Sequence, residues 1–313
     1  MIDQKIKTIA VCVCSSGVRI SLKACLTSLF QQELPGSFKM LVVVIDNSTE
    51  GNMENMLKDS NFINEKLVFC RESHPGIPFA RNAAVREANR LDVSYIAFID
   101  DDEIAPPMWL SRLTQGLIAN DADVIVGEVV RCDGLDETIE SANNYSASSD
   151  LSVLPIVKTA VTSNVLFDSR LVNDPLNLDF DEDMVFGGSD REFFMRVILA
   201  GGHIVAAKDE LVFETWPKKR RQIRYLLIRW FRYGVSFNYR YCKNYSPVKG
   251  YTLVWLMSFY KIFGSPVKLL AVPIRRIWDK RSIKRLIGTS VADIAYGLGC
   301  IAPFFGISLY KYY

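Results

Sequence analysis

The sequence of 313 residues has only two histidines and no regular spacing among its seven cysteines. An odd number of cysteines without paired spacing excludes a zinc site of the usual paired-cysteine type. It also favours a reduced, cytosolic setting over a disulfide framework. His74 and His203 have no partner pattern, and we interpret both as turn or surface residues.

The sequence also shows no signal peptide, no internal repeat and no composition typical of disorder. The segment Met1–Thr8 alternates charged and apolar residues and lacks the apolar core of a signal peptide, so we expect no export. There is no internal repeat. A composition of 49% hydrophobic and 23% charged residues is globular. The length allows one large domain with an appendage, or two modest domains.

Acidic residues are almost missing from the last third of the chain. Residues 216–313 hold 19 Lys and Arg but two acids, Asp279 and Asp293, which gives a net charge of +17. The first 215 residues carry a net charge of −15. We therefore predict an acidic catalytic domain over 1–215 and a basic, aromatic helical region over 216–313 that faces an anionic partner.

No apolar stretch in this basic region is free of interruptions. Tyr251–Ile274 contains Lys261, Pro266 and Lys268, and Leu286–Tyr310 contains Asp293 and five glycines and prolines. The second stretch is long enough to cross a bilayer, but the charge and the helix breakers weigh against it. Apolar helices with snorkelling Lys and Arg better fit an element that lies in the lipid interface.

Apolar strands alternate with helical patterns through the first half of the chain. The predicted strands are Ile9–Cys14, Leu41–Ile45, Leu67–Cys70 and Tyr95–Ile99, and the predicted helices are Leu22–Gln32, Asn52–Leu57 and Ile77–Arg90. This alternation predicts an α/β fold, a Rossmann-like and mostly parallel sheet with helices on both faces. Further along we predict strands at Val124–Val126 and Ala160–Phe167, a polar loop over Asp133–Asp150, and a helix from about Ser189.

Four acids end the strand Tyr95–Ile99. Asp100, Asp101, Asp102 and Glu103 fall at the sheet edge where open α/β folds bind ligands. Carboxylates this close repel one another unless a cation or hydrogen-bond donors compensate. A divalent metal beside such a crevice indicates a phosphate-bearing substrate. The alternative is an acidic loop that caps the next helix.

Five motifs occur in an order that resembles the family 2 glycosyltransferases, which are inverting, nucleotide-sugar-dependent enzymes with a GT-A fold. They are Ile9–Cys14 with its following helix, Val42–Asn47, Gly76–Asn82 ("G-x-x-x-A-R-N"), Asp100–Glu103 (an extended D-x-D) and Gly187–Phe194 (similar to "G-G-E-D-x-E-F-F"). The resemblance runs from about Thr8 to Arg240. Val212–Pro217 and Leu226–Gly234 are similar to segments of bacterial exopolysaccharide enzymes of the succinoglycan glucosyltransferase type.

The resemblance implies a role for each site residue. Asp102 would hold Mg²⁺ or Mn²⁺ against the two phosphates of the donor, and Asp190 would be the general base. Ser15, Asp46, Arg81, Asp100 and Asp101 would bind the donor, with Asp46 accepting from a ring N–H of the base. Asn164 and Glu192 would line the acceptor or sugar pocket. Alternatives stay open for three of them: a helix cap for Asp190, a surface arginine for Arg81, and an Asn that satisfies a loop for Asn164.

Three departures from the family pattern bear on function. Ser189 stands where the family usually has Glu, and Ser15-Ser16 replace a Thr-Tyr pair. Leu226 takes the place of the Gln that opens the Q-x-x-R-W motif of processive synthases. The last difference predicts an enzyme that adds a single sugar.

The sequence thus predicts a metal-dependent, inverting transferase with a nucleotide-sugar donor, a UDP-sugar. Its acceptor would be a polyprenyl-linked saccharide in bacterial surface polysaccharide synthesis. The protein would lie peripherally on the anionic cytoplasmic face of the cell membrane. One alternative is a nucleic-acid-binding protein that uses the basic region, but the net −15 body would repel nucleic acid, and we predict no such partner. Another is a non-catalytic homologue that binds nucleotide sugars, against which Asp102 and Asp190 argue.

Overall fold

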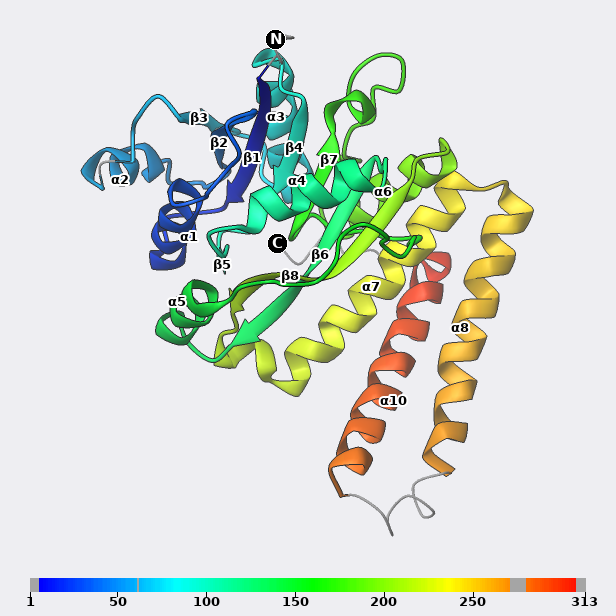
Figure 1. The fold of residues 1–313 in the computed structure, drawn as a ribbon. Coiled ribbons are helices and arrows are strands. Elements are labelled where there is room, and N and C mark those ends of the chain that lie inside the picture. The colour runs from blue at the N-terminus through cyan, green and yellow to red at the C-terminus, as the bar shows by residue number, and fades with distance from the viewer. Residues whose placement is uncertain (1–5, 61, 271–279, 308–313) are drawn as a thin grey trace. The chain divides into compact units, whose positions relative to one another are not determined.

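The structure is a computed structural model that describes residues 6–60, 62–270 and 280–307 (Figure 1). The chain divides into two compact units. The sheet unit comprises Met1–Asp183 and Ser189–Trp216, and the helical unit comprises Met184–Gly188 and Pro217–Tyr313. The second transition, between Trp216 and Pro217, falls where the acidic composition gives way to the basic one.

Eight described strands of the sheet unit form one sheet in the order β3-β2-β1-β4-β7-β6-β8-β5. Their bounds are β1 Lys7–Ser15, β2 Phe38–Asp46, β3 Leu67–Arg71, β4 Tyr95–Phe98, β5 Glu103–Ile104, β6 Val124–Cys132, β7 Val165–Asp168 and β8 Ile204–Thr215. Strands β1 to β4 pair in parallel, as the strand–helix alternation predicts. Beyond β4 the sheet is mixed, since β7 runs antiparallel to β4 and β6, and β5 runs antiparallel to β8.

Helices cover both faces of this sheet, which confirms that prediction (Figure 1). Helices α1 (Ile20–Phe30), α2 (Met53–Asp59) and α4 (Trp109–Ala119) pack on one face, and α3 (Ile77–Arg90) and α6 (Ser189–Leu199) pack on the other. Successive residues of a strand point to opposite faces, so Ile9 and Val11 join the first core and Ala10 and Cys12 join the second. The middle of β1, from Ile9 to Cys14, is therefore apolar on both faces.

Two predicted elements differ from the structure. The polar segment 133–150, predicted as a loop, contains helix α5 (Leu135–Asn144). Asp136 and Glu137 lie in its first turn, where carboxylates are favourable to the helix dipole. The strand predicted from Ala160 begins only at Val165, because Asn164 has a φ of 55° and leaves the extended conformation. Helix α4 and strand β8 were not predicted.

The helical unit is built from α7 (Ile223–Asn244), α8 (Pro247–Leu270) and α10 (Lys280–Ile301), with short turns η2 (Lys218–Arg221) and η3 (Ala302–Phe305). Helix α10 packs against both α7 and α8 (Figure 1). A Cβ atom on Gly234 would lie 2.0 Å from the carbonyl oxygen of Tyr296, so only glycine permits this approach of α7 and α10.

Membrane crossing was the open question for this region. Within the described residues, no helix combines the length and apolarity that a bilayer span requires. The ends of the two predicted apolar stretches, at Ile274 and Tyr310, lie outside the described residues, as does Asp279.

Candidate active site

The predicted donor-binding acids gather at one edge of the sheet. Strands β1 and β4 are parallel neighbours, so Ser15 at the end of β1 lies at the same edge as the acids that follow β4. The hydroxyl of Ser15 donates to the carboxylate of Asp101. The guanidinium of Arg19 lies 3.9 Å from the same carboxylate. Ser15 therefore holds the Asp101 carboxylate in place, and a hydroxyl group is all that this contact requires.

Desolvation and the neighbouring charges of the site shift the pKa of Asp100. Desolvation by the surrounding protein and repulsion from Asp102, Asp101 and Asp190 raise the pKa of its carboxyl to about 7, while the charge of Arg81 opposes the shift. Residue Asp100 is nevertheless exposed, so desolvation acts on it less than in a sealed interior. The repulsion is the part that a bound cation would relieve, and it places Asp102 and Asp190 within electrostatic range of Asp100.

Glu103 supports the acidic loop from beneath. Its side chain is buried, and it accepts a hydrogen bond of 2.9 Å from the backbone N–H of Asp100. Burial and repulsion from Asp100 and Asp102 raise the pKa of Glu103 well above its usual value. Glu103 is one of the four acids of the sequence motif, but the motif assigns it no role of its own. The signal for this role is its position at the end of the acidic run, where β5 begins.

Arg81 links the donor side of the site to the helix that carries Asp190. It is buried, which excludes the alternative of a surface helix arginine. Its Nη1 donates to the hydroxyl of Ser189 at 3.0 Å, and its guanidinium lies 5.6 Å from the centre of the Phe180 ring. Ser189 opens α6, and Asp190 follows in the first turn. Ser189, which stands where the family pattern has Glu, thus has a partner in the site, and no local sequence pattern indicates this contact.

Asp46 presents a buried oxygen that lacks a partner. It ends β2, and its Oδ1 accepts a hydrogen bond of 2.9 Å from the backbone N–H of Ser48. Its Oδ2 is buried with no hydrogen-bond partner in the part of the chain that the structure describes. Buried carboxylate oxygens in folded proteins are almost always paired, so an unpaired oxygen on a fully buried residue is unusual.

Asn164 and Glu192 make extensive structural contacts. The Asn164 amide accepts from Trp109 Nε1 at 2.7 Å and donates to the carbonyl oxygens of Glu128 and Glu210 at 2.8 and 2.7 Å. Glu192 is buried, and its two oxygens accept from Nε and Nη2 of Arg196 at 2.8 and 2.9 Å. These contacts match the alternative that Asn164 satisfies the surrounding backbone, and a place for either residue in the sugar pocket stays a prediction.

Replacing Asn164 by alanine should lower the free energy of unfolding by about 3 kcal/mol, because three hydrogen bonds are lost, two of them buried and one partly buried. Urea denaturation of the purified protein measures the change. Asn52→Ala, at an exposed residue, is the matched control and should stay within about 0.5 kcal/mol of wild type. Wild-type stability of Asn164→Ala together with lost transfer would instead place Asn164 in the sugar pocket.

The acids of this edge suit a divalent metal that is shared with phosphate. No group of three His, Cys, Asp or Glu side chains within the described residues is arranged to hold a metal ion alone. Mg²⁺ is usually bound through one or two carboxylates and the phosphates of a substrate, so a cage of protein ligands is not required. Asp102 is half-buried beside the repelling carboxylates and offers the hard oxygen ligands that Mg²⁺ and Mn²⁺ prefer.

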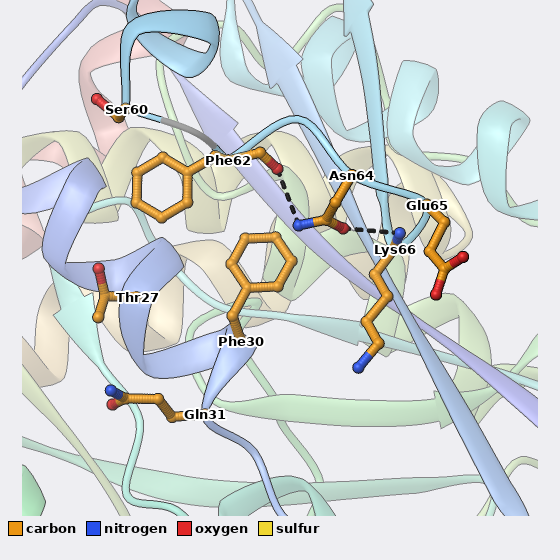
Figure 2. A pocket seen from close by; sticks show the side chains of 8 residues that line it. All are labelled: Thr27, Phe30, Gln31, Ser60, Phe62, Asn64, Glu65 and Lys66. Atoms are coloured by element: carbon orange, nitrogen blue, oxygen red, sulfur yellow. Dashed lines mark hydrogen bonds between the residues drawn. The ribbon is translucent and has the colours of Figure 1, made fainter.

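A separate hollow of about 630 Å³ lies in the sheet unit, where α1 ends (Figure 2). The stacked rings of Phe30 and Phe62, with centres 5.8 Å apart, form its apolar part, and Asn64 and Lys66 border it. None of the predicted site residues lines it. The hollow therefore does not belong to the acidic edge.

Comparison with known proteins identifies the family. The profile of glycosyl transferase family 2 matches residues 8–182, which include the acidic run, Asp46 and Arg81. The chain belongs to glycosyl transferase family 2. It is 27% identical over 229 residues to the succinoglycan biosynthesis protein ExoM of Rhizobium meliloti (strain 1021), a match that covers 69% of this chain and 70% of ExoM. The predicted resemblance to succinoglycan-type enzymes of this family is confirmed.

Solved structures share the fold. The mannosyltransferase PcManGT from Pyrobaculum calidifontis, in complex with GDP-Man and Mn²⁺, aligns with a TM-score of 0.62 at 14% identity, covering 96% of this chain and 88% of that one. TarS of S. aureus aligns with a TM-score of 0.54 at 16% identity, covering 94% of this chain and 55% of TarS. This chain thus spans little more than half of TarS. At these identities the likeness concerns the fold alone.

Proposed function

We propose that this glycosyltransferase moves one sugar, with inversion, from a nucleotide sugar to a lipid-linked saccharide during bacterial exopolysaccharide synthesis. The observation that carries the proposal is that Asp102, Asp190 and Arg81 all act electrostatically on Asp100 at the sheet edge, where Arg81 also bonds to Ser189. The likeness to ExoM, a succinoglycan biosynthesis protein, supports a role in exopolysaccharide synthesis. The complexes of PcManGT with GDP-Man and of TarS with UDP-GlcNAc support a nucleotide sugar as the donor.

The nucleotide base of the donor would occupy the end of β2. A ring N–H of the base would donate to the unpartnered Oδ2 of Asp46, as uracil and guanine can and as cytosine and adenine cannot. This contact favours a UDP-sugar, and it admits a GDP-sugar on the same chemistry. The sugar and ribose hydroxyls would then lie toward Asp100 and Asp101.

UDP or GDP should therefore bind at least about tenfold more tightly than CDP or ADP, since the wrong base leaves Asp46 unpaired. Isothermal titration with the four nucleotides in Mn²⁺ buffer measures the preference. The substitution Asp46→Asn should reduce the preference for UDP and GDP, because an amide can donate to the unprotonated ring nitrogen of cytosine. Equal affinities for all four nucleotides would show that Asp46 does not read the base.

Asp102 would hold Mg²⁺ or Mn²⁺ together with the donor phosphates. The ion supplies neutralisation of the charge that develops on the leaving diphosphate. The guanidinium of Arg81, buried at the same edge, would add positive charge near the donor. Both contributions favour departure of the nucleotide.

Asp190 would act as the general base. The acceptor hydroxyl oxygen attacks the anomeric carbon as the bond between that carbon and the phosphate oxygen breaks, and the hydroxyl proton passes to the Asp190 carboxylate. Attack from the side opposite the leaving group inverts the anomeric configuration. The first turn of α6 holds Asp190, and the bond from Ser189 to Arg81 ties that turn to the donor side.

The lipid-linked acceptor would be reached at the cytoplasmic face of the cell membrane. An anionic leaflet attracts nearby basic residues with about 1 kcal/mol per Lys or Arg. Residues 216–313 carry 19 Lys and Arg against two acids, so a fraction of these charges would hold the protein peripherally at such a surface.

A further inference from the structure

Helix α8 turns its large apolar side chains outward. Seven of them are between 49% and 79% exposed: Val248, Tyr251, Trp255, Leu256, Phe259, Tyr260 and Phe263. Their spacing of three and four residues places them on one side of the helix. A helix on the surface of a water-soluble domain normally shows the opposite arrangement, with the apolar stripe buried and polar residues outside.

Small residues lie at several contacts on the inward side of α8, beside the buried Val254. A Cβ atom on Gly250 would lie 2.5 Å from the carbonyl oxygen of Tyr241, so α8 and α7 approach closely there. Ser258 is buried and donates to the carbonyl oxygen of Gly297 on α10 at 2.9 Å. A Cβ atom on Gly297 would in turn lie 3.1 Å from the Ser258 carbonyl oxygen. Small residues and hydroxyl bonds at helix contacts are typical of helices in lipid.

A charged pair also points inward between α8 and α10. Lys261 Nζ lies 2.5 Å from Asp293 Oδ1, and Ser265 donates to the other oxygen of Asp293 at 3.1 Å. Paired charges that face the inside of a helix bundle, with apolar residues outside, are the arrangement that an apolar surrounding imposes. The interruptions seen in the sequence at Lys261 and Asp293 are thus turned away from the exposed side.

The exposed apolar surface continues onto η3. The ring of Phe304 stacks on Trp255 with centres 5.7 Å apart and meets Tyr251 edge-on at 5.6 Å. Phe305 beside it is also exposed. We call the seven outward residues of α8 with Phe304 and Phe305 the aromatic face. Contiguous exposed apolar surfaces of this kind mark an interaction site.

We propose that the aromatic face inserts into the interfacial layer of a lipid bilayer. Tyr and Trp favour that layer, because their rings are apolar and their polar groups reach water. The charge of the region selects lipid over a second copy of the chain, since two segments of +17 would repel each other and an anionic leaflet would attract each one. This proposal rests on the proposed function, because a lipid-linked acceptor is the reason for the protein to lie at a membrane. Binding to vesicles can nevertheless be measured without any acceptor.

The test is flotation of the full chain with vesicles of phosphatidylcholine alone and of phosphatidylcholine with phosphatidylglycerol. Wild type should bind both kinds, more strongly the anionic one, and high salt should remove only the electrostatic part. The double variant Trp255→Gln/Phe259→Gln should reduce partition into neutral vesicles by about a hundredfold, because two large apolar side chains no longer insert. The matched control is Ile20→Gln/Val153→Gln, at sheet-unit residues that are 75% and 85% exposed, which should bind as wild type.

Fluorescence separates insertion from mere proximity. Lipids brominated near the headgroup end of their acyl chains should quench wild-type emission more than that of Trp255→Phe, because the indole of Trp255 lies in the interfacial layer. Wild-type flotation by the double variant, or no flotation of wild type with either vesicle, would overturn the proposal. Self-association that the double variant abolishes, without vesicle binding, would assign the face to a second copy. UDP affinity of the double variant, measured in parallel, reports on the donor site and so distinguishes failure of the proposed function.

Discussion

Replacing Asp190 by asparagine should lower the rate of sugar transfer by about 10²–10⁴-fold and leave nucleotide affinity near wild type. Asparagine keeps the shape of the side chain but cannot take the proton of the acceptor hydroxyl. Since the loss concerns a proton that moves only in the transition state, kcat should fall while KM for the donor changes little. Steady-state kinetics at saturating donor measure both quantities.

The matched control for this change is Asp179→Asn. Asp179 is an exposed carboxylate that lies 3.4 Å from the guanidinium of Arg196. Arg196 belongs to α6, the helix that also carries Asp190. The Asp179→Asn variant should transfer sugar at a rate within about twofold of wild type, because surface substitutions outside a site usually have small effects. A near-wild-type rate for Asp190→Asn would mean that another carboxylate is the base.

Replacing Asp102 by alanine should reduce transfer by about a hundredfold or more, and excess chelator should do the same to wild type. The side chain would lose its bond to the ion, and the donor phosphates would then face Asp100 and Asp101 without compensation. The fold should persist, because the backbone carbonyl of Asp102, which accepts from the N–H of Thr215 at 3.1 Å, is unchanged.

Nucleotide titration with and without Mn²⁺ checks this directly. Wild type should bind UDP more tightly with the ion, and Asp102→Ala should lose most of that difference. Asp59→Ala, which removes an exposed carboxylate at the end of α2, should behave as wild type. Full transfer by wild type in excess chelator would contradict a metal-dependent mechanism.

The first half of the fold follows closely from local sequence pattern. Helix α3 has the predicted bounds, and β1 to β4 fall on their apolar runs. The runs in β1, β2 and β4 are largely buried on both faces, so no polar residue interrupts them. The order of β7, β6 and β8 did not follow, since antiparallel insertion depends on pairing between distant residues rather than on periodicity. Helix α5 was hidden by its Ser- and Asn-rich sequence, which local propensity assigns to a loop.

For the candidate site, the residues and their roles stay predictions from the sequence, and the structure adds which of these side chains contact one another. Asp46 was predicted from its motif, but its unpartnered Oδ2 required knowledge of everything packed around it. The bond between Arg81 and Ser189 joins residues that are 108 positions apart, a contact that no local pattern carries. The aromatic face was visible as composition, whereas its outward direction depends on how α8 meets α10.

The most direct test of the central claim is nucleotide release from a panel of UDP-, GDP-, CDP- and ADP-sugars in Mn²⁺ buffer, with a lipid-linked saccharide fraction as acceptor. We predict release from at least one UDP- or GDP-sugar, stimulated by the acceptor, and lost in both Asp102→Ala and Asp190→Asn. Release by wild type that neither substitution alters, or none from any sugar nucleotide, would contradict the account.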